Sequence, residues 1–134
     1  MAGTPNKMVL PQAIRRAGAV CTTAKTSYGD ATGAVLLCAG GANGSLLRKL
    51  TAIPRATVTA TQLQLFAFDG TNYWLIRTKL MAAYAMAQTT EDAETDFGYD
   101  DTKTLYLPSG WSLCVGIGVA LAAGIVFSGE LGDF

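Results

Sequence analysis

The stretch TVTATQLQLFAFDGTNYWLIRTK, residues 57–79, alternates along its length between two kinds of position. In a strand, its odd-numbered residues from Thr59 to Ala67 face one side and its even-numbered residues from Val58 to Phe68 face the other. β-Branched and aromatic residues, which favour strands, occur throughout. Residues 69–72 (DGTN) have turn chemistry, and the alternation resumes from Tyr73 to Lys79. The stretch therefore predicts a β-hairpin.

The most apolar segment, WSLCVGIGVALAAGIVF, covers residues 111–127. It has the minimum length, about 17 residues, of a membrane-spanning helix. However, a Pro108-Ser109-Gly110 turn precedes it, large and small residues alternate from Leu113 to Ala120, and residues 121–124 form a plausible break. Its flanks also lack the Lys or Arg that anchors a span. These features favour two buried strands, and a membrane protein spanning at 111–127 stays open as an alternative.

The remaining segments complete an all-β prediction. Short strands are expected around Ala19–Cys21 and Ala34–Cys38, separated by glycine-rich turns, whereas residues 80–88 fit either one short helix or a strand. Residues 1–16 mix proline, glycine and cations and predict an extended N-terminal arm. We expect one domain over residues 17–134, an antiparallel β-sandwich or jelly-roll-like fold with at most one short helix.

The composition points to covered surfaces. Half of the residues are hydrophobic and only 15% are charged, below the roughly 25% usual for soluble domains. Interface cores are depleted in charge in the same way. Residues 1–79 carry nine Lys and Arg against two carboxylates (9 − 2 = +7), and residues 80–134 carry one Lys against eight carboxylates (1 − 8 = −7). This sorting predicts a basic strip of one copy facing an acidic loop of the next, unless both faces are simply solvated.

The run EDAETDFGYDD, residues 91–101, holds six of the ten carboxylates and predicts a surface loop, either solvated or facing a subunit. Within it, Asp92, Glu94 and Asp96 alternate as in calcium loops, but the glycine falls one place late and Lys103 takes the place of the bidentate Glu, so they are weak calcium candidates. The candidate protein-interface residues are Lys7, Arg15, Arg16, Arg48, Lys49, Arg55, Glu91, Asp92, Glu94 and Asp96.

Several chemistries are excluded or disfavoured by residue type. The chain has no histidine, which excludes Ser-His-Asp and Cys-His nucleophilic pairs. Residues 39–45 (AGGANGS) lack the lysine of a phosphate-binding loop. A nucleic-acid strip of Arg48, Lys49, Arg55, Arg77 and Lys79 is less favoured than cations kept in water. We expect no enzymatic activity, no catalytic residue, no cofactor, and neither a nucleic acid nor a membrane as partner.

Three cysteines at wide spacing, Cys21, Cys38 and Cys114, fit neither a disulfide framework nor a zinc site. They predict small buried hydrophobes in a reducing compartment. The first sixteen residues contain no apolar run of signal-peptide length, so we expect assembly in a cytoplasm.

Several runs over residues 44–134 are similar to one protein class: LTAIPRATVTATQLQLFAFDG (50–70), LIRTKLMAAYAMAQTT (75–90), DFGY (96–99) and PSGWSLCVGIGVALAAGIVFSGELGDF (108–134). They resemble small structural proteins of tailed bacteriophages, of the head decoration or cement type. The resemblance implies a β-sandwich or jelly-roll domain, commonly trimeric, on the outside of the capsid at junctions between capsomers. Implied partners are the major capsid protein and further copies of the chain, assembled in the bacterial host cytoplasm. Another virion component, in the neck, tail or fibre base, is the alternative.

Overall fold

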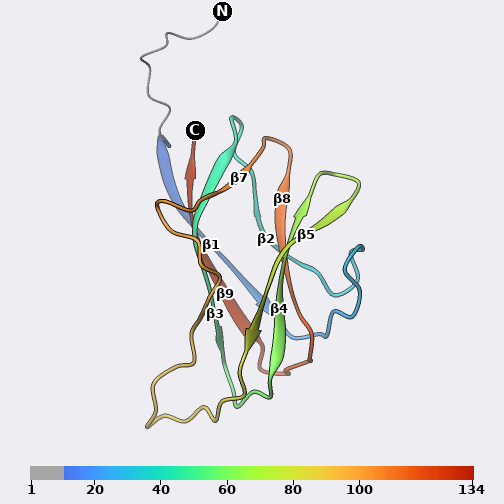
Figure 1. Ribbon diagram of the computed structural model, residues 1–134, viewed down its shortest axis with the longest axis vertical. Coiled ribbons are helices and arrows are strands. Elements are labelled where there is room, and N and C mark those ends of the chain that lie inside the picture. Colours follow the sequence, from blue (N-terminus) through green and yellow to red (C-terminus); the bar gives the residue numbers. More distant parts are fainter. Residues whose placement is uncertain (1–10) are drawn as a thin grey trace, which may run out of the picture.

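The computed structural model describes residues 11–134 and consists of two antiparallel sheets packed face to face, with no helix in that range (Figure 1). Its strands are β1 (Ala13–Cys21), β2 (Val35–Ala39), β3 (Ser45–Pro54), β4 (Thr61–Phe68), β5 (Tyr73–Met81), β6 (Thr95–Asp96), β7 (Leu105–Leu107), β8 (Ser112–Ile117) and β9 (Ile125–Asp133). The prediction of an all-β sandwich is confirmed. No helix within residues 11–134 is long and apolar enough to cross a membrane.

Sheet A has the order β1-β9-β3-β6, with β7 also paired to β3, and sheet B has the order β2-β8-β4-β5. The β2–β8 pair is nested in sequence inside the β1–β9 pair, and the two pairs lie in opposite sheets. This nesting is the arrangement of a jelly roll, in which the chain passes back and forth between two antiparallel sheets.

The two segments that decided the fold from sequence form the predicted strands. Residues 61–81 make the β4–β5 hairpin, and the apolar tract becomes β8 and β9 with a break between them. Gly124, at φ +88°, ends that break in a backbone conformation that suits glycine. β8 pairs with β4 inside sheet B, whereas β9 lies in sheet A between β1 and β3. The tract therefore supplies one central strand to each layer.

The core lies between the layers. In β4 the odd-numbered residues Thr61, Leu63 and Leu65 point inward and are fully buried, as the alternation predicted. Opposite residues of β8 and β9, such as Val115 and Phe127, complete the layer contacts and are also fully buried. Alternation of this kind along each strand is what lets two sheets share one interior.

One expectation needs correction, and one open alternative is settled. Residues 13–16 do not belong to an arm: they begin β1, which pairs with β9 over nine residues. Without β1, the edge of β9 that faces away from β3 would have unpaired backbone N–H and C=O groups. Residues 1–10, which include most of the predicted arm, lie outside the described residues. Residues 80–88 were open between a short helix and a strand, and they contain no helix: β5 continues to Met81, and Tyr84 forms two backbone hydrogen bonds of 2.9 Å with Val58.

Candidate functional site

A charged row crosses the outer face of sheet A. Arg16 of β1 lies opposite Glu130 of β9, which lies opposite Lys49 of β3. The Arg16 guanidinium is 3.0 Å from a Glu130 carboxylate oxygen. Both side chains are well exposed, and ion pairs in water contribute little to stability. The row is a solvated surface feature.

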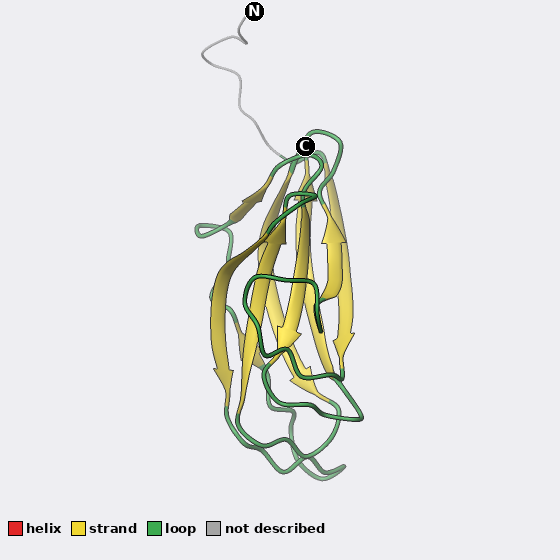
Figure 2. Ribbon diagram, turned by 90° about the vertical axis from the view of Figure 1, so that its right-hand side faces the viewer, coloured by secondary structure: helices red, strands yellow, loops and turns green. Residues whose placement is uncertain are grey.

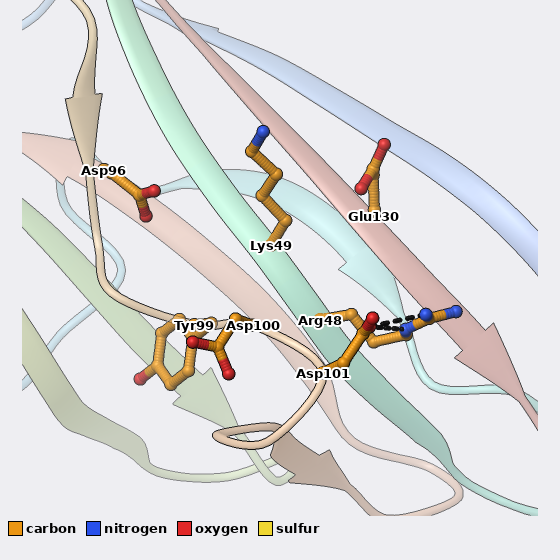
Figure 3. Close-up of a pocket in the computed structure, with 7 residues that line it drawn as sticks. All are labelled: Arg48, Lys49, Asp96, Tyr99, Asp100, Asp101 and Glu130. Carbon is orange, nitrogen blue, oxygen red and sulfur yellow. Dashed lines mark hydrogen bonds and ion pairs between the residues drawn. The ribbon is translucent and has the colours of Figure 1, made fainter.

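A bulge in β3 widens this row into a shallow pocket. The register of β3 against β9 shifts between Leu47 and Lys49, so that Arg48 and Lys49, which are consecutive, both line the pocket. The Arg48 Nε and Nη2 atoms donate to Asp101 Oδ1 at 2.8 and 2.5 Å. The pocket has a volume of about 300 Å³ (Figure 3). It is lined by Arg48, Lys49, Asp96, Tyr99, Asp100, Asp101 and Glu130.

The acidic run is held against the sandwich by its two aromatic residues. Thr95–Asp96 pairs with β3, Phe97 is fully buried, and Tyr99 is 9% exposed. Arg77 of β5 donates to the Phe97 carbonyl at 2.9 Å and lies over the Tyr99 ring, 5.2 Å from its centroid. Burial raises the pKa of Tyr99 above its ordinary value, and Arg77 partly offsets this. The predicted surface loop is therefore a broken edge strand whose carboxylates stay at the surface.

The opposite charges of the two halves of the sequence meet within one chain. The pairs Arg15–Asp133, Arg16–Glu130 and Arg48–Asp101 each join a cation from residues 1–79 to a carboxylate from residues 80–134. They are three of the four ion pairs among residues 11–134. The sorting of charge along the sequence thus has an intramolecular use, and Arg15, Arg16 and Arg48, predicted as interface residues, already have partners.

Arg15 and Asp133 close one end of the sandwich. Arg15 Nε lies 2.9 Å from Asp133 Oδ2, and the Arg15 Nη2 group donates to the Ala39 carbonyl of sheet B. The hydroxyl of buried Ser45 donates to Asp133 Oδ1 at 2.5 Å. The Ser45 hydrogen bond, followed by Arg15, holds the pKa of Asp133 below its ordinary value. This cluster links the two layers and has a structural role.

The other predicted site residues are dispersed. Lys7 lies outside the described residues, and Arg55 donates from Nε to the Ala123 carbonyl at 2.7 Å. Glu91, Asp92 and Glu94 are exposed in the connection before β6.

Within residues 11–134, no group of three or more Cys, Asp and Glu residues is placed to hold a metal ion, so Asp92, Glu94 and Asp96 are not gathered into a calcium site. Asp96 Oδ1 accepts from the Gly98 backbone N–H within its own turn. The basic strip is divided too, because Arg48 and Lys49 lie on sheet A and Arg77 and Lys79 on sheet B.

The outer face of sheet B carries an apolar row that the sequence analysis did not single out. Leu36, Cys114, Phe66 and Leu75 lie opposite one another across β2, β8, β4 and β5. Phe66 is fully buried, whereas Leu36 and Leu75 at the two ends are 59% and 42% exposed. The available signal was the even-numbered face of residues 58–68: Phe66 and Phe68 on it indicate a strand covered on both sides.

A strap formed by residues 22–34 crosses the same face (Figure 2). Its Lys25, at 1% exposure, is the most deeply buried charged residue within residues 11–134, and the Lys25 ammonium lies 4.9 Å from the Phe66 ring centroid. Lys25 Nζ donates to the carbonyls of Asp30 and Thr32 at 2.7 and 3.0 Å and lies 3.3 Å from Asp30 Oδ1. The strap is thereby fixed to the sheet, and the Lys25 charge is neutralised locally.

All three cysteines are free and buried, as predicted. Burial raises the pKa of Cys21 to about 12 and that of Cys38 to about 11, and it also raises the pKa of Cys114. The thiols are therefore protonated at neutral pH and are poor nucleophiles.

Comparisons with known proteins supply little more. No protein-family model matches the chain, and no curated protein matches it. Among solved structures, the chain is similar to the infectious bursal disease virus VP2 subviral particle, with 16% identity and a TM-score of 0.36 over 99% of this chain and 37% of that chain. A structure of the Gx strain of the same virus gives 18% identity and a TM-score of 0.36, over 99% of this chain and 36% of that one.

This chain therefore spans about a third of the length of the viral chains that it matches. A likeness at these TM-scores carries no argument about function.

Proposed function

We propose that this chain is a non-enzymatic structural protein of a bacteriophage virion, a decoration protein that binds the outer surface of the head between capsomers and stabilises it. In this proposal it acts as a homotrimer whose partner is the major capsid protein. It is made and assembled in the bacterial cytoplasm and ends on the exterior of the particle.

The observation that carries the proposal is the apolar row on the outer face of sheet B. A soluble domain that exposes Leu36 and Leu75 in line across one face is suited to contact with protein. The remaining features are consistent with a contact role: the chain has no histidine, its thiols are buried, and three of its cations pair internally with carboxylates.

The test is the number and position of copies in the purified virion. Quantitative mass spectrometry of the particle and a particle reconstruction should find hundreds of copies on the outside of the head. Six or twelve copies at a vertex or in the tail would contradict the decoration role and indicate a connector, neck or tail protein.

A second measurement addresses stabilisation. Particles that lack this chain should regain resistance to heat when the purified wild-type protein is added back. Binding without any gain in the temperature of particle disruption would contradict the stabilising role.

A further inference from the structure

Within residues 11–134, the largest group of exposed large hydrophobic side chains lies on the outer face of sheet B and on the strap that crosses it. Ten such residues are exposed, and four of them lie on this face or on the strap: Tyr28, Leu36, Leu75 and Leu80. Trp74 of β5 lies opposite the buried Ala67 and so belongs to the other face, and Ile76 falls in the bulge of β5. The corresponding set on sheet A is scattered; Ile14 and Val20 lie on β1 and Tyr106 on β7. Exposed apolar side chains that share one face indicate a contact surface more strongly than singly exposed ones do.

The strand residues of this face carry no charge. In the register of sheet B, the side chains that share the face with Phe66 are uncharged in all four strands: Leu36, Ser112, Cys114, Gly116, Gln62, Gln64, Phe68, Tyr73, Leu75, Thr78 and Leu80. Arg77 and Lys79 of β5 lie opposite the buried Leu65 and Leu63 and so belong to the other face.

The strap adds one cation and one anion, and these neutralise each other. Lys25 and Asp30 form an ion pair, and the Lys25 ammonium is covered by two backbone carbonyls as well. Sheet A shows the opposite pattern, because Arg16, Glu130 and Lys49 lie in one row across its outer face. The outer face of sheet A is therefore charged, whereas the strands of the outer face of sheet B are not.

We propose that the outer face of sheet B is where copies of this chain pack on one another. At a symmetry axis identical side chains approach each other, so any charge on the face would meet a like charge and cost several kcal/mol. A charge-free apolar face meets its own copy without this cost. In the charged row of sheet A, a carboxylate lies between two cations and all three side chains are hydrated. This row therefore needs no partner to cover it.

The inference rests on the proposed function, which includes self-association, and names the surface that produces it. It assigns the sheet B side to the axis of the oligomer. The shell protein is then contacted by other surfaces, with sheet A free to face solvent or shell.

The test compares one chemical change on two faces. Leu36→Asp and Leu75→Asp place a carboxylate in the apolar row at partly exposed positions, where neither side chain fills the core. Ile14→Asp makes the same change on β1 of sheet A, at a residue that is 75% exposed. Sedimentation equilibrium of the full chain at several concentrations gives the mass of each variant, and circular dichroism reports whether its β-structure is intact.

The expected result is an oligomeric wild-type protein, oligomeric Ile14→Asp, and Leu36→Asp and Leu75→Asp variants whose self-association is weaker by about a hundredfold or more. Oligomers that persist in both Leu variants would overturn the proposal, as would a wild-type chain that stays monomeric. Should an Asp variant lose its β-structure, Leu36→Gln and Leu75→Gln reduce the apolar area without adding charge and must still weaken association.

Particle binding separates this inference from the proposed function. An oligomeric wild-type protein that does not bind particles contradicts the decoration role and leaves the interface assignment standing. A monomeric wild-type protein whose particle binding is lost in Leu75→Asp would assign the face to the shell protein and overturn the interface between copies.

Discussion

Two rows of side chains run across the two sheets at right angles to the strands, and they have opposite character. On sheet A, Arg16, Glu130 and Lys49 form a charged row exposed to solvent. On sheet B, the row from Leu36 to Leu75 is apolar and its centre is buried beneath a strap. Both rows belong to outer faces of the same sandwich, so exposure to water alone does not determine their composition.

The two outer faces are therefore stabilised in different ways. On sheet A, charges of opposite sign pair in water, where the high dielectric constant makes each pair contribute little to stability. The apolar row of sheet B is covered at its centre by the strap, and its ends remain exposed. An apolar surface that the chain itself covers only in part is the stronger indication of a partner.

The largest expected effect comes from the centre of the apolar row. Phe66→Ala should lower the free energy of unfolding by about 3–5 kcal/mol, because it removes a fully buried ring and leaves a cavity beneath the strap. Ile14→Ala, at an exposed position of sheet A, should change it by no more than about 0.5 kcal/mol. Urea unfolding of both variants measures the difference, and equal effects would show that the outer face of sheet B is not part of the core.

Removal of the buried ammonium should have the next largest effect. Lys25→Ala leaves the Asp30 and Thr32 carbonyls without their donor and should cost about 1–3 kcal/mol. The strap should then open more often, so that Cys114, on the same face, reacts faster with a thiol reagent. Lys25→Met retains much of the packing and should show a smaller increase in reactivity. Unchanged reactivity in Lys25→Ala would mean that other contacts hold the strap.

A pair of glycines sharpens the role of the strap. A Cβ at Gly116 would lie 2.8 Å from Lys25 Cδ, whereas a Cβ at Gly118 would have only ordinary contacts, the nearest at 3.5 Å. Gly116→Ala should therefore displace Lys25 and destabilise the protein by about 1–2 kcal/mol, within the range for overpacking. Gly118→Ala serves as the matched control in thermal unfolding. The prediction fails if the two variants have the same melting temperature.

Acid should weaken the end of the sandwich closed by Asp133. Its folded pKa lies below the ordinary value of 3.8, so its contribution to stability is complete above that pH and is lost as the pH falls through the folded value. Asp133→Asn should reduce the dependence of stability on pH in this acid range. The control is Asp92→Asn, at an exposed carboxylate of the β5–β6 connection. A wild-type acid slope retained in Asp133→Asn would contradict the prediction.

The smallest effect belongs to the charged row. Arg16→Ala breaks the exposed pair with Glu130 and should cost less than about 1 kcal/mol, with the difference from wild type shrinking further as salt is added. Chemical denaturation with urea at low and high salt tests this expectation. A loss comparable to that of Phe66→Ala would remove the distinction between the two rows.

The strands that local sequence determines were predictable. The hairpin of β4 and β5 follows from alternation around the turn at residues 69–72, and the break between β8 and β9 follows from glycine and small residues. The pairing of β1 with β9 did not follow, because alternation fixes which side chains share a face and leaves the partner strand undetermined. For this reason residues 13–16 were predicted as an arm.

The candidate site was predictable in residue type but not in arrangement. The signs of Arg48 and of the acidic run indicated electrostatic contacts, yet position along the sequence does not show whether such contacts form within or between copies. Lys25 lies among Thr, Ser and Gly residues and resembles a solvated loop lysine. Its burial depends on Phe66 and Gly116, which are distant in sequence and supply the ring and the space that it occupies.

The most direct test of the difference between the two faces is the mass of the wild-type protein, measured by sedimentation equilibrium as salt is raised. From about 0.1 to about 1 M salt the Debye length falls from about 10 to about 3 Å, which screens exposed ion pairs and leaves apolar contacts intact. An oligomer joined through sheet B should keep its mass or associate more tightly. Dissociation into monomers at high salt would show that the charged face holds the copies together.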